Sequence, residues 1–255
     1  SANYNPNGCY TSVFQSGTQT RLPFDVWQLS CTASSTSCTG PTDETQIFNC
    51  TFPLWFLADP TDPGPLTPAS FAGDSWIAAV AGADDNFATS SQVATDFPVE
   101  VTSVAALDLL TAVIPYGALA PGDNTGTLST STTVLNIGNT GIDQLVDGSA
   151  MCPEFASSSS DCSLNGTSTI FTSNQQFAST SVAYNSPFAQ NLPTTTIAIP
   201  AELELNVLKT TSTSSPESDE TFWGIAVPSA ITVAGAYTGL NTFMAAVAEA
   251  IDWTP

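Results

Sequence analysis

The chain has 255 residues, of which 23 are acidic and only two, Arg21 and Lys209, are basic, so its formal charge is −21. Charged residues make up 10% of the sequence, against roughly 25% in ordinary globular domains, so the chain is short of cations rather than rich in acids. Two cations cannot neutralise a row of phosphates, which argues against nucleic-acid binding, and the same shortage disfavours anionic lipid surfaces.

The pattern of apolar residues predicts an all-β fold with little helix. Hydrophobic residues make up 42% of the chain, and short runs of Val, Ile, Thr and aromatic residues are bounded by Gly, Pro, Asn and Asp. In the first half we expect strands at residues 22–29, 48–58 and 76–83, with irregular structure at 59–65, where prolines remove backbone donors. We place a domain boundary near Pro98, between a disulfide-containing β domain at 1–98 and a β-sandwich domain at 99–255.

The second half contains the clearest strand, at residues 201–207. Its apolar and polar residues alternate, as in a sheet with one solvated face: Leu203, Leu205 and Val207 against Glu202, Glu204 and Asn206. A strand is also expected at 130–137, ended by a turn at 138–141. Residues 221–227 and 237–247 predict a closing hairpin. Residues 104–114 and 244–251 are ambiguous, and 244–249 could instead form a short terminal helix.

Two segments of the second half carry a recognisable pattern. Residues 114–122 (IPYGALAPG) lead through a Thr-rich strand to residues 134–142 (VLNIGNTGI). The pattern resembles immunoglobulin-like modules of bacterial and archaeal surface proteins, including the Hydin-like type, and residues 222–228 and 237–243 look like its closing strands. Residues 76–85 are more weakly similar to an extracellular Ig-like or PKD-like domain. The resemblance implies two Ig-like antiparallel β-sandwich domains and supplies no catalytic residues. The chain departs from antibody domains, since no Cys…Trp…Cys framework is obvious.

The cysteines indicate an oxidising compartment. The chain has six cysteines, an even number, and no two of them form a C-x-x-C pair. They are Cys9, Cys31, Cys38, Cys50, Cys152 and Cys162. Because histidine is absent, mixed Cys/His zinc sites are excluded, and disulfides are favoured over buried free thiols. We expect Cys152 and Cys162 to close a local loop. The four N-terminal cysteines are expected to pair among themselves, in an order that the sequence leaves open.

Other features agree with secretion. The chain begins at Ser1, and we expect that a signal peptide has been removed. The longest apolar stretches, such as residues 243–251, are shorter than the roughly 20 residues that span a bilayer, so no membrane insertion is expected. Asn49 and Asn165 stand in glycosylation sequons and are candidate modification sites.

Catalysis finds little support in the sequence. Without histidine, Ser-His-Asp and Cys-His arrangements are impossible. Carboxylate pairs remain an option: Asp43/Glu44, Asp59/Asp62, Asp84/Asp85 and Glu202/Glu204. The aspartates lie in turns, where Asp is common for backbone reasons, and Lys209 is interpreted as a solvated charge at a strand end. We therefore expect no enzymatic activity and no cofactor.

Calcium is the one ion that the sequence suggests, because hard cations take carboxylate oxygens from loops. The candidate ligands lie in loops of the first domain: Asp59, Asp62, Asp74, Asp84 and Asp85. The alternative is that they are ordinary turn residues, since no D-x-D-x-D-G loop is present.

The shortage of lysine suggests a function. Lysines on edge strands normally prevent sheet edges from pairing with other chains, and a chain that lacks them suits assembly with copies of itself. We expect a structural subunit of an extracellular filament, pilus-like fibre or surface layer, assembled head-to-tail by strand donation from residues 1–15. The alternative for both termini is packing on their own sandwich. The alternative functions are an adhesin that binds surface glycans through Trp27, Trp55 or Trp253, and a viral surface or capsid protein.

Overall fold

The structure is a computed structural model, and it describes residues 30–33, 48–51, 58–62, 72–77, 79–80, 89–91, 93–94, 96–111, 113–155, 162, 168–194, 199–210 and 215–249. These residues confirm the all-β prediction, because they form antiparallel β-strands and one short 3-10 helix, η1, at Thr172–Asn174, with no α-helix. The described part also contains no helix that is long and apolar enough to cross a membrane. The chain divides into two compact units, Ser1–Ser103 and Val104–Pro255, a few residues after Pro98.

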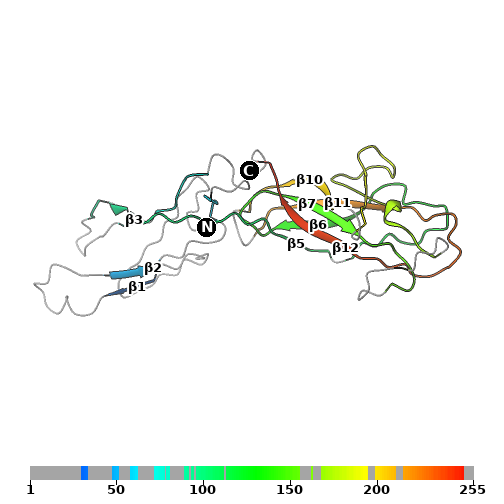
Figure 1. Ribbon diagram of the computed structural model, residues 1–255, viewed down its shortest axis with the longest axis horizontal. Helices are drawn as coiled ribbons and strands as arrows, with labels where there is room; N and C mark the ends of the chain where they lie inside the picture. The colour runs from blue at the N-terminus through cyan, green and yellow to red at the C-terminus, as the bar shows by residue number, and fades with distance from the viewer. Residues whose placement is uncertain are drawn as a thin grey trace, which may run out of the picture. The chain divides into compact units, whose positions relative to one another are not determined.

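Among its described residues the first unit contains two short strand pairs. β1 (Ser30–Ala33) pairs with β2 (Phe48–Thr51), and β3 (Ala79–Val80) pairs with β4 (Val93–Ala94). Figure 1 labels β1, β2 and β3. The expected strand at 48–58 is confirmed for its first residues, whereas Ala58 lies in a bend. The expected strand at 22–29 lies outside the described residues.

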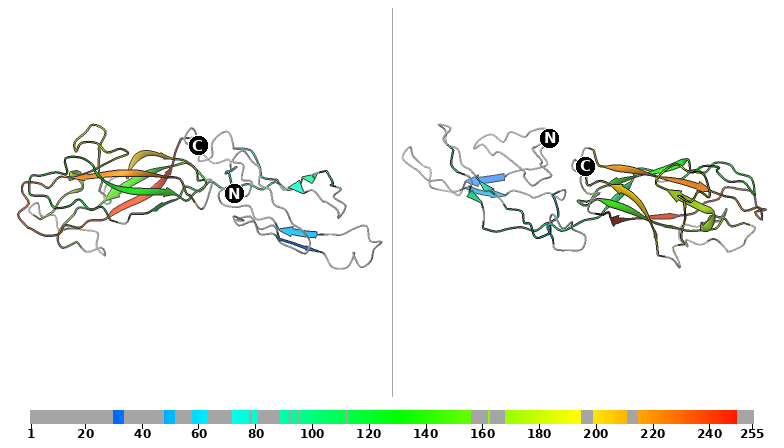
Figure 2. Two further views of the ribbon diagram at one scale, coloured as in Figure 1. Left: turned by 180° about the vertical axis from the view of Figure 1, so that it is seen from behind. Right: turned by 90° about the horizontal axis from the view of Figure 1, so that it is seen from above.

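The described residues of the second unit form two antiparallel sheets (Figures 1 and 2). The five-stranded sheet has the order β5-β6-β11-β8-β9, and the three-stranded sheet has the order β10-β7-β12. The strands of the first sheet are β5 (Leu107–Leu109), β6 (Thr130–Asn136), β8 (Gln175–Ala178), β9 (Gln190–Asn191) and β11 (Ser218–Ile225). Those of the second are β7 (Ile142–Gly148), β10 (Ala201–Val207) and β12 (Asn241–Val247).

Strands of both sheets contribute to one hydrophobic core. Trp223 of β11 is fully buried, and its indole Nε1 donates a hydrogen bond to Thr132 Oγ1 of β6 at 2.9 Å. Its ring contacts Phe177 of β8 and, edge-on, Phe243 of β12, with centroids 5.5 and 5.7 Å apart. The three-stranded sheet adds residues from β7 and β10 to the same cluster: Ile142, Val146, Leu203, Leu205 and Val207. The five- and three-stranded sheets therefore pack face to face, as in a sandwich.

Local sequence patterns predicted several of these strands well. β10 matches the expected strand at 201–207, with its leucines buried and its glutamates exposed. β6 matches the strand at 130–137, and the expected turn follows it. In that turn a Cβ on Gly138 would collide with the carbonyl oxygen of Val104. Residues 241–247 form a strand rather than the alternative helix.

The predicted closing hairpin is wrong. β11 lies in the five-stranded sheet between β6 and β8, so both of its edges are already paired, whereas β12 pairs with β7 in the other sheet. Residues 226–240 therefore connect one sheet to the other.

Candidate functional site

Among its described residues the second unit has four edge strands, and three of them are poorly suited to pairing with another chain. β5 and β9 contain only three and two residues. β10 shifts register between Leu203 and Val207, and it exposes Glu202 and Glu204. Short strands, bulges and charged side chains are the features by which proteins protect sheet edges. β12 differs, because it has seven residues in unbroken register with β7 and none of them is charged.

Two hydrogen bonds show which backbone groups of β12 face its open edge. The amide of Ala248 donates to the carbonyl of Gly141 at 3.0 Å, and the amide of Ser149 donates to the carbonyl of Leu240 at 2.8 Å. Residues along an antiparallel strand alternate between those bonded to the partner strand and those facing away. The even-numbered residues of β12 therefore bond to β7, and the N–H and C=O groups of 241, 243, 245 and 247 face the open edge.

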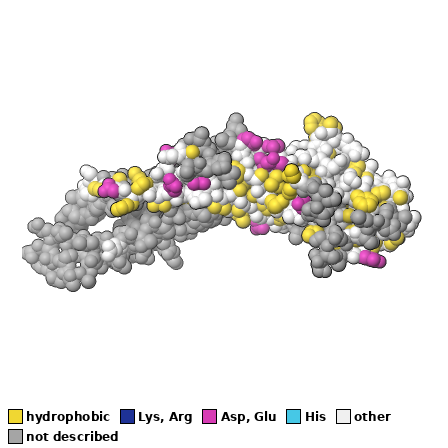
Figure 3. Space-filling view, in the orientation of Figure 1, with side chains coloured by type: hydrophobic (Ala, Val, Ile, Leu, Met, Phe, Trp, Pro, Cys, Tyr) yellow, Lys and Arg dark blue, Asp and Glu magenta, His cyan; other side chains and the backbone are white. Residues whose placement is uncertain are grey.

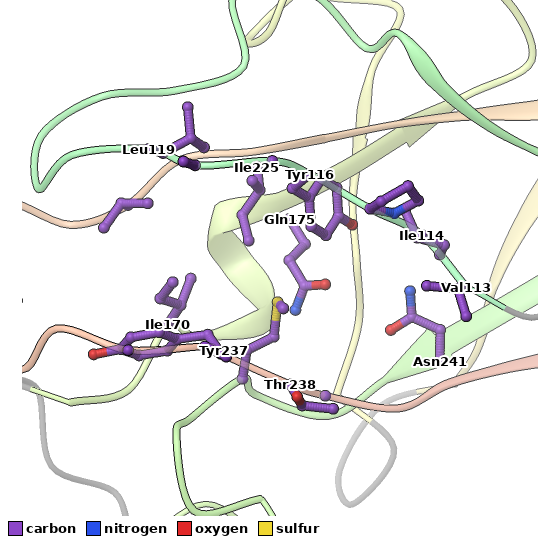
Figure 4. Close-up of a pocket in the computed structure, with 18 of the residues that line it drawn as sticks. Val113, Ile114, Tyr116, Leu119, Ile170, Gln175, Ile225, Tyr237, Thr238 and Asn241 are labelled. Carbon is purple, nitrogen blue, oxygen red and sulfur yellow. The ribbon is translucent and has the colours of Figure 1, made fainter.

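A cavity with a volume of about 960 Å³ adjoins this edge (Figure 4). One wall is the segment at 113–119, which follows β5, and the other consists of residues 231–241 and Phe243. Figure 4 shows Val113, Ile114 and Tyr116 from the first wall and Tyr237, Thr238 and Asn241 from the second. None of the described residues that line this groove is charged. Its inner side includes a small cluster of buried residues, Ile170, Ile225 and Ile231.

The segment at 113–119 also leaves backbone groups unpaired. Within the described part of the chain it makes no backbone–backbone hydrogen bond, and Pro115 contributes the one bonded carbonyl, which accepts from Thr130 Oγ1 at 3.1 Å. Unpaired backbone groups lie on both sides of an apolar groove, on 113–119 and along the edge of β12. Such groups need either water or an added strand as a partner.

Tyr116 and Gln175 are two of the polar side chains that line the groove. The hydroxyl of Tyr116 is buried and has no hydrogen-bond partner among the described residues. Burial raises the pKa of the Tyr116 phenol well above its ordinary value, with a smaller contribution from Tyr184, so the hydroxyl stays protonated and can donate. The side chain of Gln175 is also buried, and its Nε2 donates to the carbonyl of Ser149 at 3.3 Å.

Among the described residues, the surface around these features has no exposed cationic side chain. On the face in Figure 3, hydrophobic and acidic side chains are visible and no Lys or Arg. Lys209 is 3% exposed, so its interpretation as a solvated strand-end charge is wrong, and Arg21 lies outside the described residues. No exposed cation therefore protects the edge of β12 in the described part of the chain.

The proposed calcium ligands do not gather into a site within the described residues. Asp62 Oδ1 accepts hydrogen bonds from the amide and hydroxyl of Ser103 at 2.9 and 2.7 Å, which is a structural role. Asp59 is buried and Asp74 is exposed. Asp84 and Asp85 lie outside the described residues, so their role stays a prediction.

A different group of acids converges in the second unit. Carboxylate oxygens of Asp143, Glu204 and Glu249 lie within 4.8 Å of one another, and hard divalent cations take such ligands. Asp143 is buried, and its Oδ1 accepts the amides of Leu205 and Asn206 at 2.9 and 2.8 Å. These bonds fix the irregular part of β10, where Asn206 has a φ of 53°.

The structure also bears on the predicted disulfides and surface sites. Cys152 and Cys162 form the expected disulfide. β1 and β2 place Cys31 opposite Cys50 in register, whereas Cys9 and Cys38 lie outside the described residues. Asn49 is exposed. Asn165 and the three candidate glycan-binding tryptophans, Trp27, Trp55 and Trp253, lie outside the described part.

Sequence reasoning missed both the groove and the acidic group. Each brings together residues that are far apart in the chain, such as Val113 with Asn241 and Asp143 with Glu249. The one local signal for the edge was the absence of charge in residues 241–247.

No family model, curated protein or solved structure that was compared with the chain matches it.

Proposed function

We propose that the chain is a structural subunit of an extracellular homopolymer, such as a filament, pilus-like fibre or surface layer, in which copies join by adding a strand to the edge of β12. The observation that carries this proposal is the long, regular and uncharged edge of β12, whose outward backbone groups have no partner among the described residues. Main-chain hydrogen bonds at such an edge supply affinity when an extended segment is added to the sheet.

The order of strands supports an Ig-like fold for the second unit. Ig domains pair strands A-B-E-D in one sheet and C-F-G in the other. In the five-stranded sheet, the order β5-β6-β11-β8 corresponds to A-B-E-D. In the three-stranded sheet, the neighbours β7 and β12 correspond to C and F. The place of strand G, beside β12, is empty among the described residues. β10 departs from the pattern, because it flanks β7 but follows β8 in the chain.

The chemistry of the chain supports an extracellular, non-catalytic function. The disulfide between Cys152 and Cys162 suits an oxidising compartment. The described residues that line the groove are apolar, aromatic or uncharged polar and include no carboxylate, and the chain has no histidine. A binding surface for an extended apolar segment agrees with this composition better than a site of hydrolysis.

Electrostatics makes the proposed assembly sensitive to salt. Copies that each carry a charge of −21 repel one another, and this repulsion is screened over about 8 Å at physiological ionic strength. Assembly should therefore strengthen as salt is raised, because the contact itself is uncharged.

Sedimentation velocity and negative-stain microscopy of the full chain, over a range of protein and salt concentrations, test the proposal. We expect a mass that grows with concentration, and linear or sheet-like particles. A strictly monomeric chain under all conditions would contradict the proposal. A monomer that binds a glycan array would instead support the adhesin alternative.

A further inference from the structure

The groove beside β12 has the features of an incomplete part of the sandwich. The main core between the sheets is closed, with Trp223, Phe177 and Val146 fully buried. The smaller cluster of Ile170, Ile225 and Ile231 is also buried, but all three residues line the groove. Val113, on one wall, is 67% exposed although it is apolar.

An extended strand would complete this region in three ways. Its backbone could bond to the outward groups of β12 on one side and of 113–119 on the other. Its inward side chains would fill the groove that Ile225 helps to line, and one of its backbone carbonyls could accept a hydrogen bond from the hydroxyl of Tyr116. A compact ligand could satisfy the hydroxyl, but it could not pair with four alternating residues of β12, which span roughly 20 Å at 3.3 Å per residue.

We infer that this groove is the acceptor site for an uncharged, extended segment of a second copy of the chain, supplied by its first 20 residues. The inference rests on the proposed function and deepens it, because it names the acceptor site and the donor.

Charge and composition favour this donor. The groove contains no charged side chain, so an acidic or basic peptide would lose hydration without gaining an ion pair. Residues 1–20 contain no acidic or basic side chain, although the chain as a whole carries 23 acids. They also include alternating residues, Tyr10, Ser12 and Phe14, that can place aromatic groups on one face of a strand. These residues lie outside the described part, and the assignment rests on their sequence.

A matched pair of charge substitutions tests the acceptor site. Val113 lines the groove, whereas Leu110 does not, and the two side chains are 67% and 65% exposed. Val113→Glu and Leu110→Glu therefore add the same charge at equal exposure, three positions apart, and neither disturbs a closed core. We expect Val113→Glu to weaken association by on the order of tenfold or more, because its carboxylate would be buried without a partner. Leu110→Glu should associate like the unmodified chain.

Amide hydrogen exchange gives a second readout at single residues. In the assembly the amides of 243, 245 and 247 should gain protection, whereas those of 242, 244 and 246 should be protected in monomer and assembly alike. A synthetic peptide of residues 1–20, with serine in place of Cys9, should produce the same protection in trans and compete with assembly. A scrambled peptide of the same composition should do neither.

The outcomes separate the two proposals. A chain that never associates contradicts both the proposed function and this inference. A chain that assembles equally well with Val113→Glu and Leu110→Glu, or without new protection on β12, keeps the proposed function and overturns the acceptor site. An inert peptide 1–20 overturns the assignment of the donor.

Discussion

The backbone amide of Ala248 donates to the carbonyl of Gly141 at 3.0 Å, and this bond determines which residues of β12 pair with β7. Together with the bond from Ser149 to Leu240, it places the backbone groups of odd-numbered residues at the open edge of the sheet. The side chains of the same residues face the core, as Phe243 shows by its contact with Trp223. β12 can therefore gain a strand without any change to its own packing.

Proline substitutions at neighbouring positions should distinguish the edge of β12 that bonds to β7 from the edge that is open. Ala246 lies opposite Asp143 in register and bonds to β7, so Ala246→Pro removes a hydrogen bond of the sheet. It should lower the free energy of unfolding by at least about 1–3 kcal/mol, because it leaves a buried carbonyl unsatisfied. Ala245 faces the open edge, where proline is tolerated, and Ala245→Pro should destabilise the monomer much less. Urea denaturation of the two variants checks this order. Equal losses of stability in the two variants would show that the assignment of even-numbered residues to β7 and odd-numbered residues to the open edge is wrong.

Tyr116→Phe should leave the monomer as stable as the unmodified chain, or stabilise it by up to about 1 kcal/mol. The substitution removes a buried hydroxyl that has no partner among the described residues, and an unsatisfied buried polar group is itself unfavourable. Thermal and urea denaturation at neutral pH measure the effect. A loss of more than about 1.5 kcal/mol, the upper value for an ordinary hydrogen bond, would mean that the hydroxyl is already satisfied in the monomer.

The same tyrosine should make the fold sensitive to alkali. Burial raises its folded-state pKa above the ordinary tyrosine pKa of about 10, so above that pH the folded chain retains a proton that the unfolded chain releases. Stability is then fully present below the unfolded pKa and falls as the pH rises toward the folded pKa. Denaturation midpoints between pH 9 and pH 11, about one unit on either side of the unfolded tyrosine pKa, should decline less steeply for Tyr116→Phe. Parallel declines would contradict the burial of the phenol.

The hydrogen bond between Trp223 and Thr132 should contribute strongly to stability. Thr132→Val keeps the shape of the side chain but leaves the buried indole N–H of Trp223 without its acceptor at 2.9 Å. We expect a loss of about 1–3 kcal/mol in the free energy of unfolding. Ser131→Ala is the control, because the bond from Ser131 to Glu220 is exposed and should matter by no more than about 0.5 kcal/mol. Similar losses in both variants would argue against this account of the core.

The register of β1 and β2 predicts one further disulfide. Cys31 lies directly opposite Cys50, and such positions in antiparallel strands are separated by about 4.5–5.5 Å between Cα atoms, within the range that a disulfide bridges. Cys9 and Cys38 would then be left to pair with each other. Mass spectrometry of peptides from the unreduced protein should recover the link between 31 and 50. A link from Cys31 to Cys9 or Cys38 would contradict the prediction.

The sequence predicted those elements whose signals are local. β10 was predicted residue for residue because Leu203 and Leu205 alternate with Glu202 and Glu204, and the pairing of Cys152 with Cys162 followed from their short separation. The turn after β6 was likewise visible in its Gly and Asn residues.

Features that depend on distant contacts could not be predicted in this way. The sequence pattern of β12 does not reveal that its partner is β7 and not β11. That pairing depends on β6 and β8, which occupy both edges of β11. Lys209 lies beside a Ser/Thr-rich stretch and looks exposed in sequence, yet the fold buries it. The groove requires Val113 and Asn241 to reach the same cavity, which no local periodicity encodes.

Electron cryomicroscopy of the assembled full-length chain tests the central claim most directly. We predict an added strand alongside residues 241–247, with its backbone paired to the odd-numbered positions and its inward side chains in the groove. Copies that contact one another elsewhere and leave the edge of β12 open to solvent would contradict it.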